Sequence, residues 1–159
     1  MPGSMHTDGT EELSKLLGLC ATEAQNIASG ALYEGARVVA DAYKAEARNI
    51  RTAPRTRGED RTKARLSTPE EKEAVLNGIG VSRFSKDGSE VDTIIGVAEG
   101  YAYPKGRKKA IKLLARSINS GTHFMKRQPV FRKAASKSRS AAQEAMVAEA
   151  DKLINQIAK

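Results

Sequence analysis

The sequence predicts an α+β fold, with a long N-terminal helix and a C-terminal helix packed on a small antiparallel β-sheet and with long basic loops. Apolar residues recur at three- and four-residue steps near both ends of the chain, as on one face of a helix. Between residues 79 and 97 they largely alternate with small or polar residues, which is typical of strands. The length of 159 residues fits one domain. That domain is expected to cover residues 11–159, after a terminal segment, residues 1–10, that is disordered or left by the expression vector.

The first helix is expected to begin at Thr22-Glu23-Ala24-Gln25, which has the form of a capping box, and to end near Ile50. Its apolar residues form one stripe from Ala24 to Ala42. The leucines between Glu11 and Leu19 also have helical spacing, but Gly18 weakens the turn that would join them to this helix.

The segment from Arg51 to Ser67 is polar and basic and contains turn residues, so it is expected to be an exposed, mobile loop. A second, short helix should follow, with Thr68 as its cap, Pro69 at the first helical position and acidic residues in the first turn. It is expected to end near Gly78.

Two extended runs, Ile79–Val81 and Val91–Val97, predict a β-hairpin, because turn residues separate them. The segment Glu99–Gly106 is expected to be a loop. Periodicity leaves Ile111–Ile118 open between helix and strand, with a slight preference for helix. Pro129 then opens a last helix, which should run nearly to the end of the chain.

The charge of the chain is uneven. Lys and Arg number 27 against 19 acidic residues, which gives a net charge of +8, and no acidic residue occurs from Gly100 to Gln143. Such a patch attracts polyanions, nucleic acid among them, and acidic protein surfaces. A solvated basic face without a dedicated ligand is an equally weighted alternative.

Residues suited to catalysis or metal binding are few. The two histidines, His6 and His123, cannot form a catalytic triad or a metal cluster, and the single cysteine, Cys20, is expected to be a small buried side chain. The acidic residues from Glu70 to Glu73 lie near a helix start, where the helix dipole explains them. No glycine-rich phosphate loop and no run long enough to span a membrane is found. We therefore expect a soluble protein that is not an enzyme and holds no cofactor or metal.

Five short motifs follow one another over nearly the whole chain. They are Ala31–Ala36 in the first helix, Ala53–Gly58 in the basic loop, Ile95–Val97 in the sheet, the Gly-Thr turn that closes Ala115–Thr122, and Gln128–Ala134 at the last helix. In this order the chain resembles the head–tail joining, or putative tail-component, proteins of long-tailed bacteriophages, a family that includes neck and tail-completion proteins. In that family the segment before the Gly-Thr turn is a strand, so the resemblance implies a strand at Ile111–Ile118.

The resemblance further implies a structural virion protein at the head–tail junction, made in the bacterial cytoplasm, that forms an oligomeric ring around the DNA path. Its neighbours would be other neck and tail proteins and further copies of itself, and any contact with DNA would be non-specific. The loop Arg51–Ser67 would then be an arm that becomes ordered only on assembly. The alternative is a small basic DNA-binding protein that acts in regulation or packaging.

A closed ring requires contacts between two different patches of each subunit. The residues expected at these contacts are Tyr101, Tyr103, Gly121, Thr122, Pro129 and Phe131. The basic residues expected to face DNA or an acidic partner are Arg51, Arg55, Arg57, Arg107, Lys108, Lys109, Lys126 and Arg127.

Overall fold

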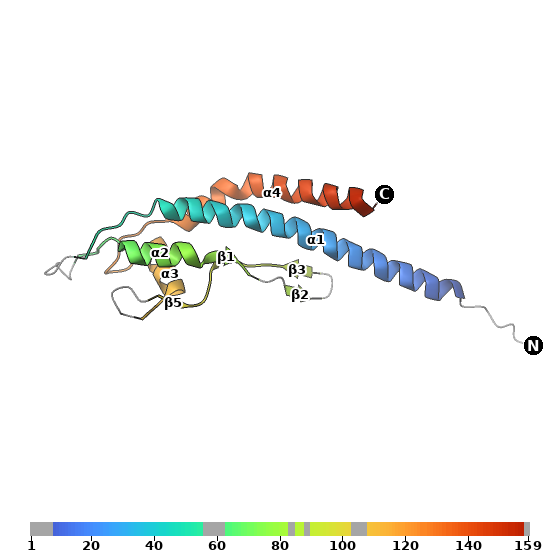
Figure 1. The fold of residues 1–159 in the computed structure, drawn as a ribbon, viewed down its shortest axis with the longest axis horizontal. Helices are drawn as coiled ribbons and strands as arrows, with labels where there is room; N and C mark the ends of the chain where they lie inside the picture. The colour runs from blue at the N-terminus through green and yellow to red at the C-terminus, as the bar shows by residue number, and fades with distance from the viewer. Residues whose placement is uncertain (1–7, 56–62, 83–84, 88–89, 103–107, 158–159) are drawn as a thin grey trace, which may run out of the picture.

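Two long helices, α1 (Asp8–Arg48) and α4 (Val130–Ile157), lie side by side and antiparallel, and the remaining elements lie on the other side of α1 (Figure 1). The computed structural model describes residues 8–55, 63–82, 85–87, 90–102 and 108–157. The predicted α+β class is confirmed. The packing differs in one respect from the prediction, in which both long helices pack on the sheet. Helix α4 packs mainly on α1 instead, and the hairpin strands contact α1.

Small residues allow α1 and α4 to approach closely. Ala36, Ala40 and Ala47 of α1 are buried, as are Ala134, Ser138 and Ala142 of α4. Near the far end of the pair, Met146 lies directly over Gly35. An ion pair between Lys137 and Glu46 also joins the two helices.

The buried alanines of α1 lie outside the stripe that the sequence predicts from Ala24 to Ala42, and Ala24 and Ala28 of that stripe are exposed. The difference arises because α1 is covered on two sides, by α4 and by the strands and α2. A single amphipathic stripe describes a helix with one covered face, so it misses the second.

The start of α1 is also earlier than expected. The helix begins at Asp8 and continues through Gly18 and Thr22, so the predicted cap at Thr22 is wrong. Residues 1–7 lie outside the described part. The Thr22 hydroxyl donates to the carbonyl of Gly18 at 2.9 Å, one turn back within the helix. A single glycine costs a helix only about 1 kcal/mol, which the good helix formers around it can offset.

Helix α2 (Pro69–Gly78) agrees with the sequence prediction at both ends. The Thr68 hydroxyl accepts a hydrogen bond from the backbone N–H of Glu71 at 3.2 Å. The Glu71 carboxylate accepts one from the backbone N–H of Thr68 at 3.0 Å, which completes a capping box. Val75 and Gly78 on the same helix are buried against the core.

The predicted hairpin is confirmed as two antiparallel ladders in series. Strands β1 (Ile79–Val81) and β4 (Ile95–Val97) pair with Ile79 opposite Val97, and β2 (Ser85–Asp87) pairs with β3 (Glu90–Asp92). A third ladder joins β5 (Tyr101–Ala102) to β6 (Lys109–Ala110), within and just after the segment expected to be a loop.

Residues 111–120 form a helix, α3 (Ile111–Ser120). The periodicity preference is therefore confirmed, and the strand that the family resemblance implies is wrong. Leu114, Ala115 and Ile118 are buried at helical spacing, which a strand would place on opposite faces. Gly121 ends the helix with φ of +76°, a conformation that favours glycine.

The hydrophobic core lies where α2, α3 and the first strand meet the C-terminal end of α1 and the start of α4. Its buried members are Ala47, Ile50, Val75, Ile79, Leu114, Ala115, Ile118, Met125 and Val130. Because this core is at one end of the helix pair, it fixes the segment between α3 and α4, which contains five of the candidate functional residues: Gly121, Thr122, Lys126, Arg127 and Pro129.

Candidate functional site

A buried carboxylate, Glu71, joins its own helix and the segment just before it to a strand that lies 38 residues later in the sequence. Its side chain is 2% exposed. It accepts two hydrogen bonds from the guanidinium group of Arg65, each 2.9 Å long, and one from the ammonium group of Lys109 at 2.5 Å. With the bond from Thr68, these contacts connect the end of the basic loop, α2 and β6. We infer a structural ion cluster, because its donors occupy both carboxylate oxygens.

Burial by itself raises the pKa of Glu71. The hydrogen bonds from Arg65, Lys109 and Thr68, together with the charge of Arg65, outweigh burial and lower the pKa from 4.5 to about 2. Because the folded-state pKa lies below that of the unfolded chain, the charged carboxylate stabilises the fold fully above pH 4.5.

This stabilisation should disappear as the pH falls from about 4.5 towards 2. The expected loss from Glu71 is about 3 kcal/mol, since one pKa unit corresponds to about 1.4 kcal/mol. Urea unfolding, followed by circular dichroism at several pH values, measures it. A free energy of unfolding that is constant from pH 5 to pH 3 in the intact chain would contradict a strongly depressed pKa.

The turn between α3 and α4 is fixed by hydrogen bonds from both sides. The backbone N–H of Gln128 donates to the carbonyl of Ile118 at 2.8 Å. The Gln128 amide also pairs with the backbone of Arg51, accepting at 2.7 Å and donating at 3.1 Å. The side-chain oxygen of Asn119 accepts from the N–H of Phe131 at 3.2 Å, and so satisfies a free donor at the start of α4.

The predicted contact residues of this turn have different environments. Thr122 is exposed, and its backbone pairs with that of Met125. Gly121 approaches Arg127 so closely that a side chain at position 121 would collide with it. Phe131 packs against the core and against Tyr43, with ring centroids 5.3 Å apart. A change at Phe131 would therefore disturb folding, which makes this position unsuitable for testing a subunit contact.

The other predicted contact patch contains two tyrosines, and the structure describes one of them, Tyr101. Tyr101 is 58% exposed, and the ammonium group of Lys108 lies 4.0 Å from the centre of its ring, a cation–π contact. Tyr103 and Arg107 lie outside the described residues.

Most of the predicted basic residues that the structure describes are exposed, but one is bound within the fold. Arg51, Arg55, Lys108, Lys126 and Arg127 are exposed. The expectation that Lys109 faces a partner is corrected, because Glu71 binds its ammonium group. The prediction for Arg57 falls outside the described residues.

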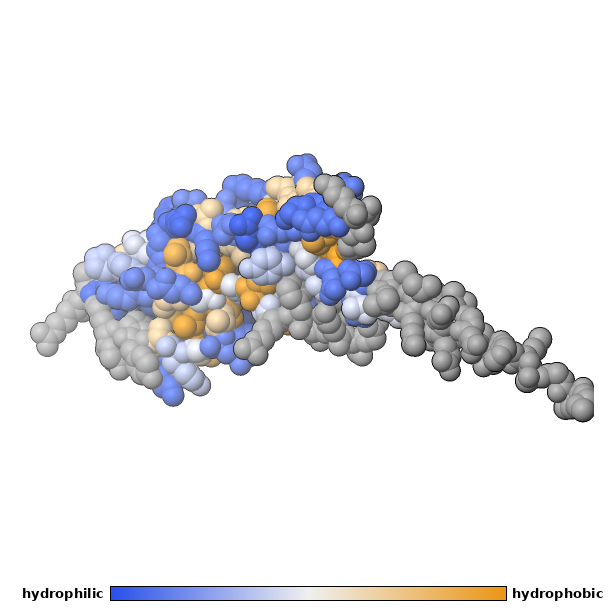
Figure 2. Space-filling model, turned by 45° about the vertical axis from the view of Figure 1, so that its right-hand side comes forward, coloured by the Kyte–Doolittle hydropathy of each residue, from blue (hydrophilic) through white to orange (hydrophobic). Residues whose placement is uncertain are grey.

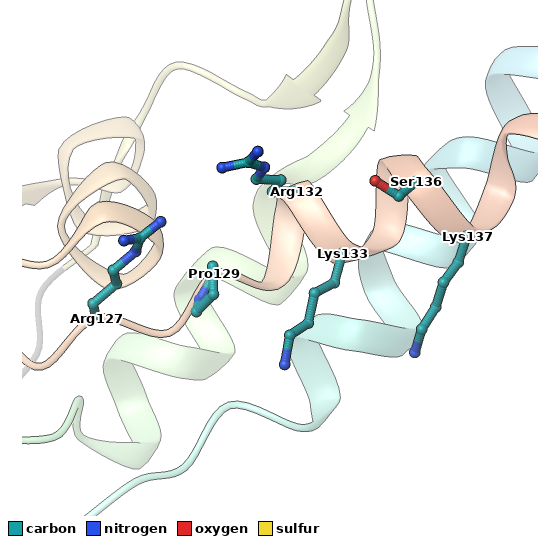
Figure 3. A pocket seen from close by; sticks show the side chains of 6 residues that line it. All are labelled: Arg127, Pro129, Arg132, Lys133, Ser136 and Lys137. Atoms are coloured by element: carbon teal, nitrogen blue, oxygen red, sulfur yellow. The ribbon is translucent and has the colours of Figure 1, made fainter.

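The first two turns of α4 carry cations that were not singled out from the sequence. A shallow groove of about 420 Å³ is lined by Arg127, Pro129, Arg132, Lys133, Ser136 and Lys137. Figure 3 shows the guanidinium groups of Arg127 and Arg132 on one side of Pro129, and the ammonium groups of Lys133 and Lys137 extending together on the other. The i, i+4 spacing of Lys133 and Lys137 on a predicted helix is the signal that could have identified this groove.

An apolar surface lies on α3 and the turn that follows it. Leu113 is 62% exposed and Phe124 is 64% exposed, and both line a second depression together with Lys108 and Ala110. In Figure 2 hydrophilic side chains follow the upper edge, at the level of α4, and apolar side chains gather lower, at the level of α2, α3 and the strands. On the hairpin, Ile94 is 72% exposed.

Over the described ranges, the structure contains no cluster of three or more His, Cys, Asp or Glu residues suited to a metal ion. Within the same part of the chain, none of the helices combines the length and the apolar character that a membrane span requires. Comparisons with protein-family models, with curated proteins and with solved structures find no match to this chain.

Proposed function

We propose that this chain is a structural assembly subunit at the head–tail junction of a long-tailed phage, where copies of it form a ring around the DNA path. Support comes from the motif order that resembles head–tail joining proteins. The observation that carries the proposal is that one chain presents two different surfaces with exposed large apolar side chains, Ile94 on the hairpin and Leu113 with Phe124 on α3 and the turn after it.

The first surface is the hairpin. Its strands contain the acidic residues Asp87, Glu90 and Asp92 beside one basic residue, Lys86, and the side chains of Asp92 and Ile94 are exposed.

The second surface, which is basic, is the outer side of α3 with the turn after it, where Lys108, Lys112 and Arg116 are exposed near Leu113 and Phe124. Glu99, which follows the hairpin, pairs with Lys112 of the second surface at 3.6 Å.

These two surfaces suit a head-to-tail contact between copies. Opposite charges would orient the subunits, and burial of Ile94, Leu113 and Phe124 would contribute about 1.5–3 kcal/mol for each fully covered side chain. Because the two surfaces are different, repeated contacts generate a ring when the rotation closes.

The test is cross-linking inside particles. A chain with Ile94→Cys and Leu113→Cys, in a Cys20→Ser background, would be supplied to the phage of the source host and treated with a short bis-maleimide. Purified particles should contain the chain and give a ladder of covalent multimers, because each copy contributes one cysteine to each of two neighbours.

The matched control replaces Val147, an exposed residue on α4, instead of Leu113. The Ile94→Cys and Val147→Cys pair should give no ladder. Particles that contain the chain but yield only dimers would contradict the head-to-tail contact, and particles without the chain would contradict the virion role.

The second candidate function is a small basic DNA-binding protein that acts in regulation or packaging. The groove on α4 favours it, because cations gather there without acidic neighbours in equal number. If the protein has this function, it is absent from phage particles, and its binding to a duplex survives excess competitor DNA.

A further inference from the structure

The groove on the first two turns of α4 has a net positive charge that the fold does not neutralise. Of its four cations, Lys137 pairs with Glu46. In the part of the chain that the structure describes, no acidic side chain pairs with Arg127, Arg132 or Lys133. Three cations that line one groove without counter-ions indicate a site for an anionic partner, because that partner would supply the negative charge that the fold does not.

We propose that this groove binds the phosphate backbone of duplex DNA. The proposal rests on the proposed function, in which the subunit surrounds a DNA path, and it adds the surface of the subunit that touches the DNA. A duplex carries one negative charge per about 1.7 Å of its axis, so the three cations of the groove that have no acidic partner can neutralise several phosphates at once.

The shape of the surface favours a broad, stiff polyanion. Between the cations, α4 exposes Ser136, which is small and leaves the helix accessible. Lys133 and Lys137 are one turn apart, about 6 Å along the helix axis. The Ser136 hydroxyl lies on the Arg132 side of the helix (Figure 3) and can donate to a phosphate oxygen. An acidic peptide would be expected to use pockets for its apolar side chains, whereas this groove is shallow and open.

The positive surface also continues beyond the groove. A neighbouring depression shares Arg127, Pro129 and Lys133 with it and adds the exposed cations Arg51 and Lys126. Two adjoining depressions lined by cations are more than a single free phosphate ion needs, so they favour an extended polyanion.

The groove lacks the amide side chains that read adenine edges, and we assign its arginines to phosphates. Its lining contains no Asn or Gln, and the nearby Gln128 amide is engaged with the backbone of Arg51. Contacts to phosphates position a protein without selecting a sequence, so the binding should be sequence-independent.

The test uses the purified full chain and a fluorescent 20-base-pair duplex of arbitrary sequence. Arg132→Ala combined with Lys133→Ala should weaken binding at least tenfold at low salt. It should also reduce the slope of log affinity against log salt concentration by about 1.8, since each phosphate contact contributes about 0.9.

The matched control is Arg37→Ala with Lys152→Ala, which removes the same charge from exposed positions outside the groove and outside both proposed contact surfaces. It should leave the slope unchanged, and thermal melting of both variants verifies that they fold. Equal losses in the two variants would overturn the proposal, because they would show an effect of net charge alone. Equal displacement of the duplex by polyglutamate at the same charge concentration would also overturn it, in favour of an acidic protein partner.

The result of the duplex-binding experiment is independent of the result of the cross-linking experiment on phage particles. A chain that enters particles and forms the cross-linked ladder but does not bind duplex would end the DNA assignment and leave the ring in place. A chain that binds duplex through Arg132 and Lys133 but is absent from particles would retain the groove and end the virion role.

Discussion

Glu71→Gln is expected to lower the free energy of unfolding at pH 7 by about 3 kcal/mol. Removal of one partner from a buried ion pair costs about 3–5 kcal/mol, because the other charge stays buried without a partner. Here two cations, Arg65 and Lys109, would remain close together without their carboxylate. The lower end of the range applies because their side chains are 14% and 29% exposed, so water can solvate part of the charge.

Glutamine is the informative replacement because it keeps the shape of the side chain. Its amide oxygen can still accept from the backbone N–H of Thr68, and a capping box tolerates glutamine. The substitution therefore removes the negative charge and keeps the capping hydrogen bond. Urea unfolding with circular dichroism measures the loss, and the variant should also lack most of the acid-dependent loss between pH 4.5 and pH 2.

The control is Glu73→Gln, on an exposed position of the same helix. It removes the same charge and should change the free energy of unfolding by no more than about 0.5 kcal/mol. A loss below about 1 kcal/mol for Glu71→Gln would mean that water screens the cluster and that the fold does not depend on it.

The elements that the sequence predicts correctly are those that local chemistry determines. The cap at Thr68, Pro69 at the first helical position and the capping box with Glu71 all act within four residues, and α2 has the predicted bounds. The α3 helix is likewise encoded locally, in the spacing of Leu114, Ala115 and Ile118.

Expectations failed where a local signal was ambiguous or where a contact joined distant residues. The pattern at Thr22 has the form of a cap, yet the helix continues through it. Glu71 was explained by the helix dipole alone, although its partner Lys109 follows 38 residues later. Periodicity within one segment contains no information about such a partner.

The candidate surfaces show the same limit. The sequence identifies the acid-free stretch from Gly100 to Gln143 but not the direction in which each cation points. The fold assigns Lys109 to Glu71 and Lys137 to Glu46, and it brings Arg127 next to Arg132 and Lys133 at the groove. Only packing distinguishes a cation that stabilises the chain from one that is available to a partner.

Gly35→Leu is expected to lower the free energy of unfolding by about 2 kcal/mol, through the contact between the two long helices. A side chain at position 35 would enter the space that Met146 occupies, including its Cγ, Sδ and Cε atoms. Overpacking at such a contact costs about 1–3 kcal/mol or more, because the helices must separate or the side chains must leave their preferred rotamers. The higher helix propensity of leucine offsets about 0.8 kcal/mol of this cost.

Gly18→Leu on the same helix provides the matched control. A side chain at position 18 would meet no atom within 4 Å, so this variant receives the propensity gain without the collision. It should be stabilised by about 0.8 kcal/mol. Urea unfolding of the two variants then separates packing from propensity, because the substitution is identical. If Gly35→Leu were stabilised to the same extent as Gly18→Leu, α4 could not lie against α1 at this position.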